Sequence, residues 1–415
     1  MNNKATNKKA RKSNRYIFSL LLLTLFVIMV GFGVIMPILP YYAENLGASA
    51  TELGLLTATY ASLQFVFAPF WGKISDRTGR KPILLIGLFG FAITFVGFGL
   101  STRLWMLFAA RAVSGLISSA TLPTVMAYIA DTTEKGERGG GMSQLGAAMG
   151  LGMIFGPVIG GFLGEFSAST PFFVSAAMAF AVAVFAIFFL PESLTDEVRK
   201  AAHQDTSRSS GILDIFNMLR GPLAFLLLMA LLTSFGIAQL ESTSALFYER
   251  KFGAGEAEMG LIFMVMGVVQ FIAQMFLVGR VIKRLGEERA IQIGLFGSAA
   301  AFAVYPLITN LSSAMVVVGF MGLSTSFLRP ALNSLISNRT SASKQGVTLG
   351  VANSYYSLGR MFGPVTGGLL FDYLGLNSPF LSAALINFLA FALTMFIFAK
   401  NEKEPAHIVA HTAGK

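Results

Sequence analysis

Cysteine is absent from the 415-residue chain, and histidine occurs only three times. Without cysteine, disulfides and thiolate metal sites are excluded. The histidines lie in polar segments, so a histidine proton relay inside a membrane is excluded as well. A metal centre with histidine or cysteine ligands is therefore not expected within the membrane. We expect neither a metal nor a cofactor. The three positions are His203, His407 and His411.

Charge is also scarce. Only 13% of the residues are charged and 54% are hydrophobic, whereas about a quarter of the residues in a soluble domain carry charge. The apolar residues gather in runs of about 20, the length needed to cross a bilayer. In lipid, every backbone polar group must bond within its own segment, so each run is expected to be a helix. We therefore expect an all-α membrane protein with about twelve spans, at 16–40, 52–72, 82–101, 104–130, 142–164, 170–190, 222–248, 257–280, 289–309, 311–338, 345–371 and 378–399.

The net charge of +10 invites a nucleic-acid interpretation, but the positions of the basic residues argue against it. Six basic residues precede the first run, and further ones gather in every second loop, as the positive-inside rule describes for cytoplasmic loops. This pattern predicts a multi-pass protein with both termini in the cytoplasm and no nucleic-acid partner. The first run is too long for the apolar part of a cleavable signal peptide, so we expect it to remain as a span.

Two similar halves make up the chain. Residues 156–163 read GPVIGGFL and residues 363–370 read GPVTGGLL, an offset of 207 residues that also pairs Pro123 with Pro330. Such a repeat indicates duplication, and repeated halves with a site between them are typical of transporters. We predict a basic N-terminus at 1–15, a six-helix bundle at 16–190, a linker at 191–221, a second bundle at 222–399 and a tail at 400–415.

The loop after the second span carries the most specific motif. It reads Gly72-Lys73-Ile74-Ser75-Asp76-Arg77-Thr78-Gly79-Arg80-Lys81-Pro82. The loop resembles the signature loop of the major facilitator superfamily, and this resemblance implies the fold of two pseudo-symmetric six-helix bundles. We expect Gly72 to permit close packing, Gly79 to form a tight turn, and Asp76 to latch one conformation with Arg77 and Arg80 nearby.

Glycines line one face of the fifth span. Residues four apart share a helix face, and glycine lets another helix approach closely in lipid. The segment is similar to the antiporter motif that marks exporters within the superfamily, which favours export over uptake. The residues concerned are Gly152, Gly156, Pro157, Gly160 and Gly161.

We single out three charged residues inside spans, Arg111, Glu241 and Arg329. A charge there is costly and is a functional-site hypothesis by default. Arg111 resembles the superfamily's fourth-helix arginine, implicated in proton coupling. Glu241 and Arg329 are similar to the pair found in Gram-positive multidrug and quinolone exporters of the twelve-helix drug:proton antiporter branch, and we expect them to pair. The quinolone exporter of this group has an acidic residue three positions before the arginine, where this chain has Ser326.

Other polar or polarisable residues within the spans are candidates for substrate binding, together with Glu241. They are Gln64, Met126, Gln144, Gln239, Asn333, Asn353, Tyr355 and Tyr356.

The resemblance implies a monomeric, proton-coupled exporter of amphipathic drugs in a bacterial cytoplasmic membrane. Glu241 would carry the proton, Arg329 would tune it, Arg111 would support coupling, and Asp76 would latch the outward-facing state. No ATP-binding loop motif occurs in the sequence. A dedicated metabolite or lipid exporter or flippase of the same fold is the alternative. An enzyme is not expected, because no histidine or cysteine stands within the spans.

Overall fold

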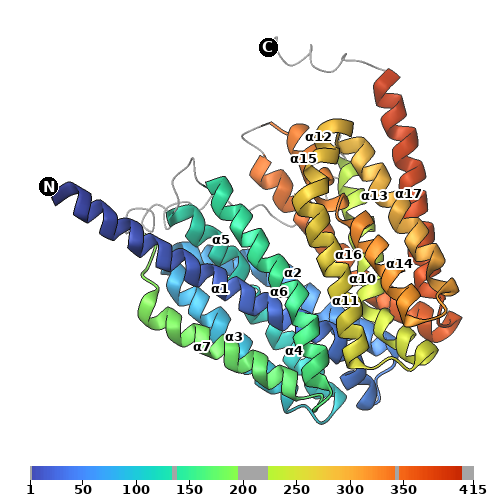
Figure 1. Ribbon diagram of the computed structural model, residues 1–415, viewed down its shortest axis with the longest axis horizontal. Coiled ribbons are helices and arrows are strands. Elements are labelled where there is room, and N and C mark those ends of the chain that lie inside the picture. The colour runs from blue at the N-terminus through green and yellow to red at the C-terminus, as the bar shows by residue number, and fades with distance from the viewer. Residues whose placement is uncertain (1, 133–137, 195–222, 342–344, 404–415) are drawn as a thin grey trace.

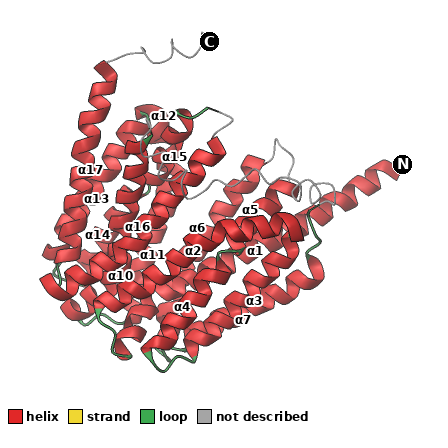
Figure 2. Cartoon of the chain, turned by 180° about the vertical axis from the view of Figure 1, so that it is seen from behind, coloured by secondary structure: helices red, strands yellow, loops and turns green. Residues whose placement is uncertain are grey.

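The computed structural model describes residues 2–132, 138–194, 223–341 and 345–403, with side chains described from residue 16 onward except at 130, 138–143 and 400–403. Helices make up nearly all of these residues, and no strand occurs among them (Figure 2). Eleven segments are long and apolar enough to cross a membrane. The remaining expected span, 345–371, forms a 30-residue helix that is less hydrophobic than the others. Its hydropathy is reduced by the polar residues Asn353, Arg360 and Asp372. The prediction of an all-helical membrane protein is confirmed.

Figure 1 shows two groups of helices side by side, blue to green on the left and yellow to red on the right. The first half contains α1 (Asn2–Asn45), α2 (Ala50–Thr78), α3 (Arg80–Gly99), α4 (Leu104–Ser118), α5 (Thr121–Thr132), α6 (Arg138–Gly164) and α7 (Thr170–Phe189). The second half contains α10 (Ala224–Phe252), α11 (Glu256–Ala273), a π-helical turn (Gln274–Val278), α12 (Gly279–Leu285), α13 (Glu287–Val304), a 3₁₀ turn (Tyr305–Leu307), α14 (Leu311–Thr325), α15 (Leu328–Asn338), α16 (Gln345–Leu374) and α17 (Ser378–Lys403).

The basic N-terminal segment continues the first span, since α1 begins at Asn2. Most of the expected linker and tail lies outside the described residues, which omit 195–222 and 404–415.

The fourth span of each half is broken at the same position of the repeat. The α4–α5 break falls at Ser119 and the α14–α15 break at Ser326, 207 residues later. Proline has no N–H, and its ring clashes with the carbonyl group four residues earlier. Pro123 and Pro330 stand four residues after these two serines, so the same proline explains both breaks. The duplication seen in the sequence therefore includes the position of this helix break.

The two halves meet closely along two pairs of helices, α2 with α16 and α6 with α11. Glycines make this approach possible. A Cβ atom on Gly161 would lie 2.5 Å from the carbonyl oxygen of Glu256, and one on Gly260 would lie 2.5 Å from that of Pro157. A Cβ atom on Gly368 would lie 2.7 Å from the Cα atom of Thr51. Backbone therefore packs directly on backbone, as is common where membrane helices associate through small residues.

Polar contacts join the halves at the end of the molecule that holds the α1–α2 and α10–α11 turns, which we call the far end. Asp372 at the end of α16 accepts hydrogen bonds from the Thr51 N–H at 2.8 Å and the Thr51 hydroxyl at 2.7 Å. Arg250 pairs with Glu44 at 3.2 Å. These contacts lie opposite the loop that contains Gly79, which we call the motif end. The halves are thus fastened together at the far end.

Candidate functional site

Glu241 in α10 forms an ion pair in the middle of the second half, but its partner is not the expected one. The Arg360 guanidinium of α16 donates to Glu241 Oε2 at 3.3 Å. The Glu241 side chain is 18% exposed and that of Arg360 is 56% exposed. The expected pairing of Glu241 with Arg329 is therefore wrong for this conformation. α10 and α16 pack closely against each other, and this proximity brings Arg360 to Glu241.

Arg329 lies at the start of α15, directly before Pro330, and contacts α16. Its guanidinium donates to the Asn353 side-chain oxygen at 3.0 Å and lies 4.9 Å from the ring centre of Tyr356. Tyr356 is buried, whereas Arg329 and Asn353 are exposed. The structure thus brings three of the predicted residues together, with an aromatic face and an amide holding the cation.

Arg111 of α4 is buried in the first half, at 6% exposure. Its guanidinium lies 4.7 Å from the ring centre of Tyr60 in α2. No carboxylate pairs with Arg111 among the described residues, and its Nε and Nη1 atoms have no hydrogen-bond partner there. The Tyr60 hydroxyl is within hydrogen-bonding distance of Ser118 at 3.1 Å and accepts from Gln64 at 3.0 Å. Arg111 therefore faces an aromatic ring of α2, and no carboxylate among the described residues compensates its charge.

The remaining candidates for substrate binding do not form one cluster. Gln239 is buried and donates to the Thr366 hydroxyl at 3.3 Å, so it packs between α10 and α16 in this conformation. Tyr355 is also buried, and Asn333 is half-buried. Met126 and Gln144 are exposed, on α5 and α6 of the first half.

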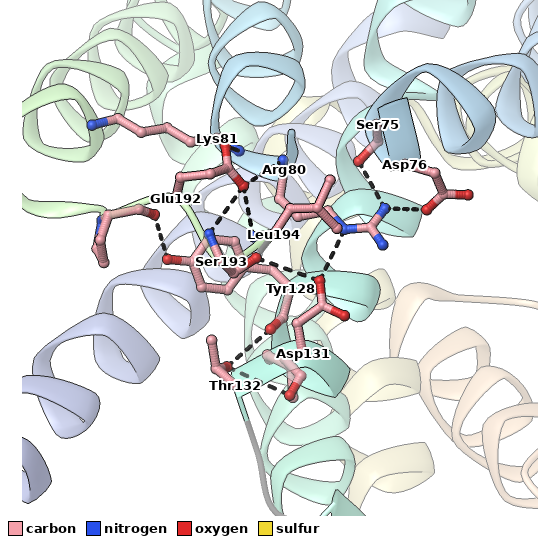
Figure 3. A network of polar contacts seen from close by, with 12 residues as sticks. Ser75, Asp76, Arg80, Lys81, Tyr128, Asp131, Thr132, Glu192, Ser193 and Leu194 are labelled. Carbon is pink, nitrogen blue, oxygen red and sulfur yellow. Dashed lines mark hydrogen bonds and ion pairs between the residues drawn. The ribbon is translucent and has the colours of Figure 1, made fainter. Parts of the chain in front are cut away.

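Arg80 organises the loop between α2 and α3 (Figure 3). Its side chain, 8% exposed, pairs with Asp76 at 2.5 Å and with Asp131 of α5 at 3.0 Å, and it also donates to the Ser75 hydroxyl at 3.1 Å. Two carboxylates and a hydroxyl thus compensate one buried guanidinium, as a buried charge requires. The motif therefore ties the end of α2 to the end of the fourth span.

Glu192, just after α7, completes this network. Its Oε1 atom accepts from the Arg80 backbone N–H at 2.8 Å, and its Oε2 atom accepts from that of Lys81 at 3.1 Å. A carboxylate at a helix N-terminus satisfies free N–H groups and complements the helix dipole. Gly79 has φ +118°, and a Cβ atom there would collide with the Glu192 carboxylate. The predicted tight turn at Gly79 is therefore confirmed, and its close neighbour is Glu192.

The expectation for Gly72 is corrected by the structure. A Cβ atom on this residue would meet nothing within 4 Å, so Gly72 makes no close packing contact in this conformation. Asp76 is 51% exposed on its side chain and bonds within its own half.

In the second half, the position equivalent to Arg80 is Glu287, and the one equivalent to Asp131 is Asn338. Glu287 Oε1 accepts from the Asn338 side chain at 2.9 Å and from the Ser334 hydroxyl at 2.8 Å. The second loop lacks the acidic residue of the motif, yet it keeps a contact between the start of the third span and the end of the fourth, equivalent to that of Arg80 with Asp131. The direction of the hydrogen bond is reversed: Glu287 accepts from Asn338, whereas Arg80 donates to Asp131 in the first half.

The glycine face of α6 packs on α1 of its own half. A Cβ atom on Gly156 would lie 2.5 Å from the Val30 carbonyl oxygen, and one on Gly152 would lie 2.5 Å from the Met29 Cβ atom. A Cβ atom on Gly160 would lie 3.0 Å from the Val34 Cα atom. The carbonyl group of the adjoining Pro157 and the Cβ position of Gly161 face α11 of the other half. One helix therefore contacts both halves through residues without bulky side chains.

Comparisons with known proteins assign the chain to a family. A model of the Major Facilitator Superfamily matches residues 21–320 and 242–414. The chain belongs to the major facilitator superfamily.

Among its relatives is multidrug resistance protein 2 of Bacillus subtilis, which is 33% identical over 94% of this chain and 96% of that protein. The class B tetracycline resistance protein of Escherichia coli is 32% identical over 83% of this chain and 86% of its own. The quinolone resistance protein NorA of Staphylococcus aureus is 26% identical over 86% and 90%. These proteins place the chain among the transporters of the superfamily, not among enzymes.

Solved structures show the same fold at lower identity. A bacterial homologue of the lysosomal transporter Spinster, in an inward-facing and occupied conformation, matches with a TM-score of 0.76 at 16% identity. The match covers 94% of this chain and 99% of that one. The nucleoside transporter NupG matches with a TM-score of 0.79 at 14% identity, over 92% and 100%. The expected major facilitator fold is confirmed.

Sequence reasoning missed several residues of this superfamily member's site. Arg360 is a charged residue in the interior of an expected span, so the rule that singled out Arg111 and Arg329 applies to it equally. Glu192 and Asp131 stand at the ends of apolar runs, where carboxylates are ordinary. Only the folded chain reveals that both surround Arg80.

Proposed function

We propose that this major facilitator protein exports amphipathic drugs from a bacterial cytoplasmic membrane in exchange for protons, as a monomer. The Glu241–Arg360 ion pair carries the proposal, because it places an exchangeable carboxyl group within a membrane helix. The names of the relatives, which include multidrug, tetracycline and quinolone resistance proteins, support drugs as the substrates.

The proposed orientation places the motif end, both termini and the linker in the cytoplasm, following the basic residues of that end. The far end then faces outward. The contacts of Asp372 with Thr51 and of Arg250 with Glu44 close the outer side, so this conformation admits substrate from the cytoplasm.

In the proposed cycle, Glu241 alternates between an ion pair with Arg360 and a protonated state. When a proton binds, the ion pair with Arg360 breaks, and when the proton leaves, the pair forms again. Arg329 and Arg111 would act on Glu241 through their charge, and not through the direct contact expected for Arg329. The exposed candidates Met126, Gln144 and Asn353 and the half-buried candidates Gln64 and Asn333 would contact substrate.

Opening of the outer side would require the far-end contacts to break and new contacts to form at the motif end. Asp76 is suited to this because half of its side chain is exposed and its Oδ1 atom alone is engaged with Arg80. We propose that it latches the outward-facing state. The glycine contacts of α6 with α1 and α11 would allow the helices to shift without side-chain clashes.

Reconstituted protein tests the proposal. Proteoliposomes with an imposed pH gradient are given tetracycline or a quinolone, and proton flux is followed with an internal pH dye. We expect substrate-dependent proton flux in the wild type and its loss in Glu241→Gln. Glu165→Gln, which removes an exposed carboxylate beyond α6, is the matched control and should transport normally. Unchanged flux in Glu241→Gln would show that another group carries the proton.

A further inference from the structure

The interior of the spans carries more positive than negative charge. Among the described residues, Arg111, Arg329 and Arg360 lie well inside membrane helices, and Glu241 is the single carboxylate at comparable depth. The other acidic residues that the structure describes stand at or near helix ends or in turns. Three guanidinium groups therefore face one carboxylate, and two positive charges are left without a carboxylate.

The three arginines are close enough to affect one another. Arg360 repels Arg111 across the boundary between the halves and repels Arg329 within the second half. The charge of Arg360 also acts on Tyr60 of the first half. Arg360 therefore interacts electrostatically with arginines of both halves.

Most of the hydrogen-bonding capacity of these arginines is unused. A guanidinium has five N–H donors, yet Arg360 donates one described bond to Glu241 and Arg329 donates one to Asn353. Both side chains are exposed, so their remaining donors are accessible to a ligand. Arg111 is buried and has two unpaired nitrogen atoms. A buried cation without a carboxylate is costly, which is a second and independent sign that an anion belongs nearby.

We propose that Arg360, assisted by Arg329, binds an acidic group of the substrate, so that the preferred substrates are amphipathic compounds that carry a carboxylate or sulfonate. Arginine is suited to this role because its planar fork matches these groups with two hydrogen bonds. The three arginines, Glu241 and one bound acidic group together have a net charge of about +1. Because this net charge is still positive, Glu241 can stay ionised beside the bound group. The proposal rests on the proposed transport function and names the substrate class of its central site.

A matched pair of probes tests this preference by binding alone, without any proton gradient. Dansyl-phenylalanine and dansyl-phenylalanine amide share the fluorophore and the apolar bulk, and they differ in the carboxylate. Each is titrated onto purified protein in lipid nanodiscs, and dansyl fluorescence gives the dissociation constant. The ratio of the two constants reports recognition of the acidic group.

We expect the acid to bind about 10- to 100-fold more tightly than the amide to the wild type, the range for one charge-assisted hydrogen bond. Arg360→Gln should reduce this ratio to nearly one with little change for the amide, and Arg360→Lys should retain part of it. Arg329→Gln should reduce the ratio less. Arg103→Gln, which removes an exposed arginine before α4, should leave the ratio as in the wild type.

Equal binding of acid and amide by the wild type would overturn the proposal, as would a ratio unaffected in Arg360→Gln. Glu241→Gln separates this proposal from the proposed function. If Glu241→Gln transports normally while the acid preference still depends on Arg360, the proton assignment fails and the acid subsite stands. If Glu241→Gln loses proton flux while acid and amide bind alike, the acid subsite fails and the proton assignment stands.

Discussion

Gly368 in α16 offers a direct way to force the far end open. The position of its absent Cβ atom lies against the backbone of α2, in collision with the Ala50 carbonyl oxygen and 2.7 Å from the Thr51 Cα atom. Gly368→Ala should therefore push α2 and α16 apart. Gly350 lies in the same helix with nothing within 4 Å of its Cβ position, so Gly350→Ala makes the same chemical change without the clash.

The magnitude follows from the contacts beside Gly368. Ordinary contact begins at 3.4 Å, so α2 must move away by roughly 0.7 Å or more. That shift stretches the bonds of Asp372 to the Thr51 N–H and hydroxyl, now 2.8 and 2.7 Å. A hydrogen bond to a charged group contributes about 1.5–3 kcal/mol. Loss of one such bond shifts the equilibrium toward the open far end by about 10- to 100-fold.

Because the chain has no native cysteine, spin labels can be placed without background. We would introduce Asn45→Cys and Tyr373→Cys, exposed positions on opposite halves at the far end. Double electron–electron resonance then gives the distance distribution between the labels. In Gly368→Ala we expect a longer distance to gain population, and in Gly350→Ala we expect the wild-type distribution. Identical distributions in the two variants would refute the idea that close α2–α16 packing keeps this end closed.

Two further predictions concern the first half. Arg80→Gln leaves Asp76 and Asp131 without their cation. Loss of a hydrogen bond to a charged group costs about 1.5–3 kcal/mol, so we expect a lower melting temperature of purified protein, and an unchanged one would contradict the structural role of the network. Gly156→Ala places a methyl group 2.5 Å from the carbonyl oxygen of α1 and should reduce transport, whereas Gly146→Ala on the same helix meets nothing within 4 Å and should transport normally.

The fold could be predicted from the sequence because bilayer thickness and the repeat constrain it strongly. The span boundaries followed from runs of apolar residues, and the turn at Gly79 followed from a motif in which glycine supplies a positive φ. The break at Ser119 could have been predicted from Pro123, since proline disrupts the helix four residues earlier.

The pairing of charges could not be predicted in the same way. Glu241 and Arg360 are 119 residues apart, and only the packing of α10 on α16 places them together. The resemblance to known exporters suggested Arg329 as the partner, because a family pattern names residues without fixing their rotamers or the conformation. Gly72 shows the same limit: its open surroundings describe one state of a protein that must adopt at least two.

The internal repeat shows which features the two halves share and which they do not: the turns are repeated, and the charges inside the spans are not. Gly79 and Gly286 stand at equivalent positions, and both have positive φ, +118° and +83°. The central charges are not repeated in this way: Val34 is equivalent to Glu241, and Met153 is equivalent to Arg360.

Features present in both halves, such as these turns and the proline breaks, serve the folding and movement that both halves share. Charges present in one half serve a task that the halves do not share. The second half holds the ion pair and two of the three interior arginines. Proton exchange and recognition of an acidic group would therefore act on α10, α15 and α16, and the first half would contribute Arg111 as a cation facing them.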